Sequence, residues 1–299
     1  MRVLVTGWPS FLHGEATAGD VQSMRRVSAA LTAAGIPSRS AWSPVFRPGA
    51  LTLEAADPGD FTHLVFACGP AHGPQVRWLH EKFAACRRIV VGVSVIDGDD
   101  AAVTGFHHVL ARDGPNESTV DLAAGGTLAP VPVAGVVLAP GQAEYGARRQ
   151  HDQVHREVTT WVNERDCAPV PLDTRLDGTD WRHCATPDQF AAILRRLDVV
   201  VSSRLHGVVF ALRAGTPVLA VDPVAGGGKV SAQVSAWGWP ALLTADQVCD
   251  SGGKARFARW WNWCLSDEAS RHARTCAIRT TEKLTTQLVS ILREDRANR

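Results

Sequence analysis

Two short apolar runs separated by one helical pattern constrain the fold of this chain most strongly. Asp198-Val-Val-Val201 leads into Ser202-Ser-Arg-Leu-His-Gly207, a helical pattern follows, and Val218-Leu-Ala-Val221 closes the unit. This order predicts a β-α-β unit with Arg204 and His206 where the first strand ends and the helix begins. Ligands of open parallel sheets gather at that end, near helix N-termini that attract anions. The segment therefore predicts a small anionic substrate and proton transfer.

Strand and helix patterns alternate along the rest of the chain, which predicts mostly parallel sheets covered on both faces. Strands are expected over residues 3–5, 63–68, 88–95, 135–139, 168–172, 198–201 and 218–221. Helices are expected over 20–34, 74–85, 151–164, 187–196 and from 266 onward. A stretch rich in Gly, Ala and Pro over 123–132 predicts a linker. We expect an α/β protein with two Rossmann-like domains in tandem, 1–130 and 131–299, and a cleft between them.

Composition narrows the class of protein. The chain has 299 residues, 45% of them hydrophobic and 20% charged, as in a soluble globular protein. Its formal net charge of +1 gives no basic field for nucleic acid. The first residues predict a strand and a turn instead of a signal peptide, and no apolar window is long enough to span a membrane. Seven scattered cysteines without a C-x-x-C pair favour reduced thiols. We therefore expect a cytoplasmic protein.

The chemistry of the central segment rests on three residue types. Arg204 can hold a phosphate or carboxylate in a bidentate contact. His206 is of the type that exchanges protons near neutral pH, and Gly207 allows a backbone or ligand to approach closely. An arginine packed on the sheet edge and a histidine capping the helix would explain the same residues equally well. Gly226-Gly-Gly-Lys229 lacks the spacing of an NTP-binding loop. It is either a flexible loop that brings a cation to the site of Arg204 or a solvated loop tip.

Several other residues have structural explanations that compete with functional ones. Asp20 is expected to cap the next helix, although it could also face a cleft and accept a hydroxyl proton. Arg112-Asp113 predicts a local salt bridge. The cluster Trp260-Trp-Asn-Trp263 is more typical of core packing than of sugar binding. His107-His108 lacks the i, i+4 spacing of a helical metal pair, so no metal site is expected.

The sequence resembles the polysaccharide pyruvyl transferase family. The resemblance is carried by Ser202-Ser-Arg-Leu-His-Gly207 after its apolar strand, by Ala214-Gly-Thr-Pro217, and by Lys229. Weaker similarities are Gly19-Asp20, Arg112-Asp113 with Glu117-Ser118, and Gly135-Val-Val-Leu138. Ala139-Pro-Gly141 stands where an arginine would be usual in the family, and Pro70 interrupts a turn that is usually rich in glycine.

This resemblance implies a fold similar to the GT-B glycosyltransferases and a transfer of pyruvate from phosphoenolpyruvate to a saccharide, forming a ketal and releasing phosphate. It implies no cofactor besides this donor substrate, and a lipid-linked acceptor would bring peripheral membrane contact. His206 would be the general acid and Asp20 a carboxylate beside the substrates. The donor would be bound in the C-terminal domain, the acceptor on the N-terminal side. The expected substrate-binding residues are Ser203, Arg204, Leu205, Gly207, Lys229, and Arg148 or Arg149.

Two other functions fit the same pattern. One is a nucleotide-sugar glycosyltransferase on the same type of fold. The other is a catalytically silent binding subunit in envelope assembly.

Overall fold

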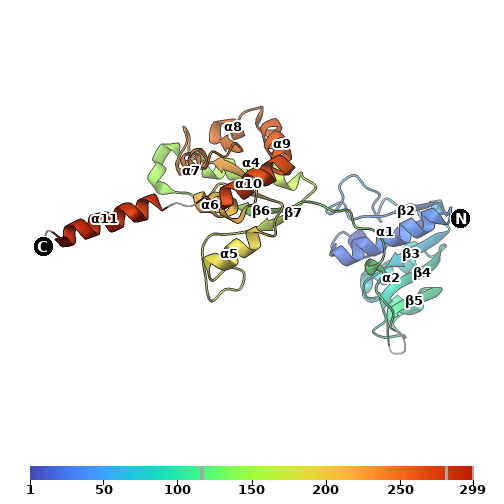
Figure 1. Cartoon of the computed structure of the whole chain (residues 1–299). Helices are drawn as coiled ribbons and strands as arrows, with labels where there is room; N and C mark the ends of the chain where they lie inside the picture. Colours follow the sequence, from blue (N-terminus) through green and yellow to red (C-terminus); the bar gives the residue numbers. More distant parts are fainter. Residues whose placement is uncertain (115–117, 280–281, 298–299) are drawn as a thin grey trace. The chain divides into compact units, whose positions relative to one another are not determined.

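The computed structural model describes residues 1–114, 118–279 and 282–297, so Glu117 lies outside the described residues. The chain divides into two compact units, Met1–Leu128 and Ala129–Arg299 (Figure 1). Each unit contains one five-stranded sheet in which every paired strand is parallel. The predicted fold class, two α/β units of Rossmann type in tandem, is confirmed. The predicted cleft between the units stays a prediction.

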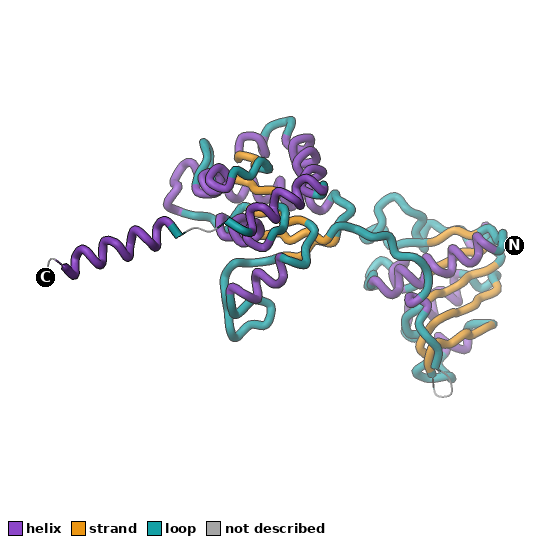
Figure 2. Tube along the Cα trace, in the orientation of Figure 1, coloured by secondary structure: helices purple, strands orange, loops and turns teal. Residues whose placement is uncertain are grey.

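The first unit has the strand order β2-β1-β3-β4-β5 (Figure 2). Its strands are β1 (Val3–Thr6), β2 (Ser38–Ser40), β3 (His63–Ala67), β4 (Arg87–Ser94) and β5 (His108–Asp113). Its helices are α1 (Ala18–Ala33), α2 (Pro74–Lys82) and α3 (Ala101–Thr104), with short 3-10 turns η1 (Trp8–Ser10), η2 (Pro58–Asp60) and η3 (Leu122–Ala124).

The interior strand β1 explains why both faces of this sheet are covered. Val3 and Val5 lie in one apolar cluster with Met24 of α1, whereas Leu4 lies in another cluster with Leu79 of α2. Successive side chains of a strand point to opposite faces, so a continuous apolar run requires a helix layer on each side. The same reasoning predicted the parallel sheet from the sequence.

The second unit has the strand order β10-β9-β8-β6-β7. Its strands are β6 (Val133–Val137), β7 (Ala168–Pro171), β8 (Val199–Ser202), β9 (Val218–Asp222) and β10 (Leu242–Thr244). Its helices are η4 (Ala143–Arg148), α4 (His151–Asn163), α5 (Pro187–Leu194), α6 (Leu205–Ala214), α7 (Lys229–Trp237), α8 (Ala245–Cys249), α9 (Gly253–Cys264), α10 (Asp267–Ala277) and α11 (Lys283–Ala297).

Aromatic side chains of α9 complete the core of the second unit. Trp161 is 2% exposed and stacks on Phe257, with ring centroids 5.1 Å apart. Trp261 is buried and contacts the edge of Trp161. The tryptophan cluster therefore packs into the core, as predicted. The helical pattern predicted from residue 266 onward forms two separate helices, α10 and α11.

All seven cysteine side chains are unpaired thiols in this structure. Burial raises the pKa of the Cys68 and Cys264 thiols above their ordinary value, so they remain neutral apolar side chains. Across the part of the chain that the structure describes, no helix is long and apolar enough to cross a membrane.

Candidate functional site

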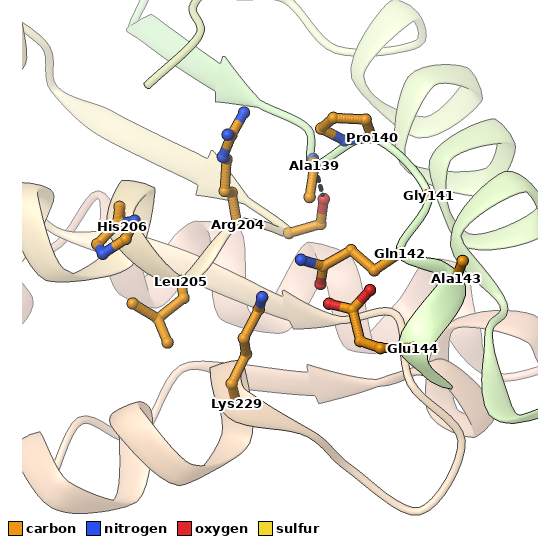
Figure 3. A pocket seen from close by; sticks show the side chains of 11 residues that line it. Ala139, Pro140, Gly141, Gln142, Ala143, Glu144, Arg204, Leu205, His206 and Lys229 are labelled. Atoms are coloured by element: carbon orange, nitrogen blue, oxygen red, sulfur yellow. Dashed lines mark hydrogen bonds between the residues drawn. The ribbon is translucent and has the colours of Figure 1, made fainter. Parts of the chain in front are cut away.

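The strand order of the second unit creates a crevice between β6 and β8. These two strands are hydrogen-bonded neighbours, but the chain continues from β6 outward to β7 and from β8 outward to β9 on the other side. The segments that follow β6 and β8 therefore diverge at the carboxyl edge of the sheet, where α/β proteins bind ligands. A cavity of 510 Å³ lies at this point. It is lined by 139–144 after β6, by 203–206 after β8, and by Lys229 after β9 (Figure 3).

The start of α6 is held firmly against the sheet. Arg204 is the N-cap residue, and its backbone N–H donates to the Ser202 hydroxyl at 3.1 Å. Gly207 is buried, and a Cβ atom there would lie 2.3 Å from Ser202 Oγ and 3.0 Å from Val137 Cγ1. The close approach predicted for Gly207 is thus between helix and sheet. Because the first N–H groups of a helix have no intrahelical acceptor, the start of α6 presents donors to the cavity, where Leu205 and His206 lie.

Ser203 joins three elements at the cavity wall. Its buried hydroxyl oxygen accepts a hydrogen bond from the backbone N–H of Ala139 at 2.9 Å and shares another of 2.9 Å with Nε2 of His155. Burial, and then the neighbouring His151 ring, lower the pKa of the His155 ring below its ordinary value. A neutral imidazole on α4 therefore supports the segments after β6 and β8. His155 was not predicted, since the sequence places it on an otherwise ordinary amphipathic helix.

Arg204 is engaged by an acidic residue that sequence reasoning missed. Its Nη1 atom donates to Oδ1 of Asp173 at 2.6 Å, and the two side chains are 28% and 34% exposed. Asp173 follows β7 by two residues, at the same carboxyl edge of the sheet. Figure 3 shows Arg204 and Lys229 on different segments of the cavity wall, with the Arg204 guanidinium directed away from Lys229. An incoming anion must share the guanidinium with Asp173.

Lys229 is positioned by a buried carboxylate. Asp222 is completely buried at the end of β9 and accepts hydrogen bonds from the N–H groups of Val224, Gly228 and Ser231, and from the Ser231 hydroxyl. These bonds fold the glycine loop back, so that α7 begins at Lys229. The sequence predicted a flexible loop or a solvated tip. Instead the loop is held in place, and Lys229 is exposed on the same cavity as Arg204.

The segment after β6 adds a negative charge to the cavity. Glu144 and Gln142 line it, and Figure 3 shows both side chains directed toward Lys229. The charged groups along the wall are therefore two cations, Arg204 and Lys229, and one carboxylate, Glu144. Sequence reasoning missed Glu144, although its place just beyond a strand end was a usable signal.

Arg148 and Arg149 do not line the cavity. Arg149 lies against the loop, where its guanidinium would be 3.1 Å from a Cβ atom at Gly141, and it pairs with Asp152 at 3.2 Å. Arg148 lies over the ring of Tyr145, 5.8 Å from its centroid. Their role in substrate binding stays a prediction.

Asp20 belongs to the first unit, and its predicted capping role is wrong. Thr17 is the N-cap of α1, because its side chain accepts the Asp20 N–H at 3.1 Å. The Thr17 hydroxyl in turn donates to Oδ2 of Asp20 at 2.7 Å. Asp20 is therefore in the first turn of the helix, where a carboxylate is favoured by the helix dipole. The predicted salt bridge of Arg112 with Asp113 is present at 2.8 Å, and Arg112 also pairs with Asp121 at 2.5 Å.

The described site can be compared with known proteins. No curated protein sequence matches this chain. Among solved structures it is similar to the spinosyn forosaminyltransferase SpnP, with 13% identity over 93% of this chain and 94% of that one and a TM-score of 0.32. It is also similar to Acinetobacter baumannii MurG, with 8% identity over 98% and 99% and a TM-score of 0.36. It is similar as well to the E. coli heptosyltransferase WaaC, with 10% identity over 88% of this chain and 100% of that one and a TM-score of 0.27. Likenesses this weak carry no argument about function.

A family model gives the more specific result. The model described as polysaccharide pyruvyl transferase matches residues 170–223. This segment runs from the end of β7 to just beyond β9 and contains both Asp173 and Arg204. The resemblance to the polysaccharide pyruvyl transferases is thus confirmed over residues 170–223, which include the ion pair at the cavity and His206.

Proposed function

We propose that this protein transfers the pyruvyl group of phosphoenolpyruvate to two hydroxyl groups of a saccharide and releases phosphate. One observation carries the proposal. The 510 Å³ cavity at the switch point of the second sheet brings Arg204, His206 and Lys229 together, and the first two lie in the segment that matches the pyruvyl transferase family. Two cations and a helix N-terminus suit a donor that carries both a phosphate and a carboxylate.

The binding roles follow from where each group lies. The N–H groups at the start of α6, beside Ser203 and Leu205, would bind one anionic group of the donor. Lys229 would bind the other as a point charge from the start of α7. Arg204 would turn part of its guanidinium from Asp173 to the ligand, because five N–H donors allow it to hold two oxyanions at once. Gly207 supports this site by letting α6 approach the sheet.

The chemistry needs a proton at the methylene carbon of the donor. As an acceptor oxygen forms a bond to the adjacent carbon, the methylene becomes a methyl group by taking a proton, which His206 would donate. The bond from that carbon to the phosphate oxygen then breaks, leaving an oxocarbenium-like centre. A second hydroxyl adds there and closes the ketal. Of the two hydroxyl protons released, one replaces the proton that His206 gave and the other leaves with the solvent or phosphate.

The first unit would supply the acceptor side. Asp20, whose carboxylate is held by Thr17, is our proposed group for accepting a hydroxyl proton from the saccharide. Arg149 lies against the Gly141 loop and is paired with Asp152, so a contact with substrate would require it to leave Asp152.

The test measures phosphate release from phosphoenolpyruvate with a panel of saccharides, and phosphoenolpyruvate binding by calorimetry. We expect Arg204→Ala to weaken donor binding at least tenfold. His206→Ala should retain binding and lose turnover at least a hundredfold, which is typical of a general acid. Arg213→Ala, at the far end of α6, and His183→Ala, outside the cavity, are the matched controls and should behave as wild type.

Unchanged donor binding in Arg204→Ala, or lost donor binding with retained turnover in His206→Ala, would refute these roles. Absence of both donor binding and phosphate release would refute the proposed function itself. Thermal stabilisation by a nucleotide sugar, and none by phosphoenolpyruvate, would favour a glycosyltransferase instead.

A further inference from the structure

A second, smaller cavity shares His206 with the 510 Å³ cavity. It measures 170 Å³ and is lined by Thr174, Leu176, Pro187, Phe190, His206 and Phe210. His206 thus lines both an apolar cavity and a charged one. We propose that this apolar cavity binds a ring-sized, uncharged substituent of the saccharide acceptor. The inference rests on the proposed pyruvyl transfer and names the class of acceptor.

The floor of the apolar cavity is built by two packed helices. Phe190 of α5 is 2% exposed and belongs to the core of the unit. Its ring meets that of Phe210 on α6 edge-on, with centroids 5.7 Å apart and planes at 76°. Phe210 lies four residues after His206, which places both on the same face of the helix. This floor is fixed by core packing, so the cavity exists before any ligand binds.

The outer wall comes from the segment between β7 and α5. Thr174 and Leu176 line the cavity there, and Leu176 is 42% exposed. A large apolar side chain at that exposure leaves a hydrophobic edge beside the opening. Burying this edge against an apolar ligand would be favourable, at about 25 cal/mol for each Å² removed from water.

The size and lining of the cavity specify the ligand group. An apolar protein cavity of about 150 Å³ is known to hold benzene. A cavity of 170 Å³ therefore has room for one aromatic or six-membered carbon ring. Its lining contains no carboxylate, lysine or arginine, so a charged group would lose its hydration without gaining a partner.

The shared histidine connects this cavity to the reaction. A ring held on the floor formed by Phe190 and Phe210 would bring the sugar attached to it against His206, which we propose as the proton donor. The preferred acceptor is then a sugar with an aryl or alicyclic substituent next to its reacting hydroxyls. A methyl glycoside would occupy only the charged cavity and would lack the contact with the apolar cavity.

The first measurement is independent of catalysis. We expect 4-fluorobenzyl alcohol to bind wild-type protein in a fluorine NMR titration. Leu176→Asp, which puts a charge at the partly exposed wall, should weaken this binding at least tenfold. Trp181→Ala is the matched control, because Trp181 is in the same segment and is 92% exposed but does not line the cavity. Leu176→Ser serves as the second variant if thermal melting shows that Leu176→Asp does not fold.

The second measurement compares phenyl and methyl glycosides of the sugar that supports phosphate release. We expect wild type to prefer the phenyl glycoside about tenfold in kcat/KM, and Leu176→Asp to lose this preference. A probe that fails to bind wild type, or that binds the variant equally well, overturns the inference even when phosphate is released. Probe binding without donor binding or phosphate release would retain the apolar site but refute its assignment to an acceptor, together with the proposed function.

Discussion

Replacing Asp173 with asparagine should strengthen the binding of phosphoenolpyruvate. In the structure, Asp173 Oδ1 lies 2.6 Å from Arg204 Nη1 and occupies part of the guanidinium that the donor needs. The carboxylate also repels an incoming anion. Asp173→Asn keeps the shape of the side chain but removes its charge, so both effects should be relieved.

The magnitude follows from the charges and their exposure. Two unit charges about 4 Å apart interact by about 4 kcal/mol at an effective dielectric constant of 20, and by about 1 kcal/mol in water. Both side chains are about one-third exposed, and ion pairs near the surface usually contribute less than about 1 kcal/mol. Asp173→Asn relieves two effects of this size, the competing ion pair and the repulsion of the donor. We therefore expect phosphoenolpyruvate to bind more tightly by about 1–2 kcal/mol, which is about 5- to 30-fold in Kd.

The assay is calorimetric titration with phosphoenolpyruvate at low salt, repeated at about 1 M salt, where screening should reduce the gain. Asp250→Asn is the matched control. It removes the same charge from the same unit, but Asp250 pairs with Arg256, is 46% exposed and does not line the cavity. Its Kd should change less than twofold. Unchanged or weaker binding in Asp173→Asn would show that Asp173 aligns the guanidinium for the donor and does not compete with it.

Three further predictions concern stability, each measured by urea unfolding. Gly207→Ala should cost about 1–3 kcal/mol, because its methyl group would overlap Ser202, whereas Gly98→Ala, with open space around it, should be neutral. Trp161→Ala should cost about 3–5 kcal/mol, but the exposed Trp181→Ala less than about 0.5 kcal/mol. Burial lowers the pKa of His151 below its ordinary value of 6.5, so the unfolded chain binds protons more readily and stability should fall as pH drops below 6.5. This slope should flatten in His151→Phe. A neutral Gly207→Ala or Trp161→Ala, or an unchanged slope, would contradict the corresponding reasoning.

The fold was predictable because its signals are local. The runs Val3-Leu-Val5 and Val199-Val-Val201 are short and continuous, as strands buried on both faces must be. Helices between them then require a parallel sheet. The capping of α1 was not predictable in the same way. Thr17 and Asp20 are both capping residue types three positions apart, and composition alone does not decide which one begins the helix.

The candidate site was predictable only in part, because its groups come from different loops. Arg204 and His206 are adjacent to one strand end, so a single motif located both. Asp173 reaches Arg204 only through the pairing of β7 with β6 and of β6 with β8. The hydrogen bond between Ser203 and His155 likewise depends on how α4 packs. Contacts of this kind require the strand order, which local patterns do not contain.

When the strands of each unit are numbered along the chain, both sheets have the order 2-1-3-4-5. The two units differ in the residues that follow the first strand, at the switch point between the first and third strands. In the first unit, Trp8 follows β1 and covers Gly69, where a Cβ atom would lie 2.0 Å from the indole. The corresponding segment of the second unit is Ala139-Pro-Gly141, whose small side chains leave the 510 Å³ cavity open between β6 and β8. In the proposed function, these small residues would widen the donor side of the site. Arg204 and Lys229 would then bind the donor without an arginine from 139–141, which is why the charge of Asp173 should matter to the affinity.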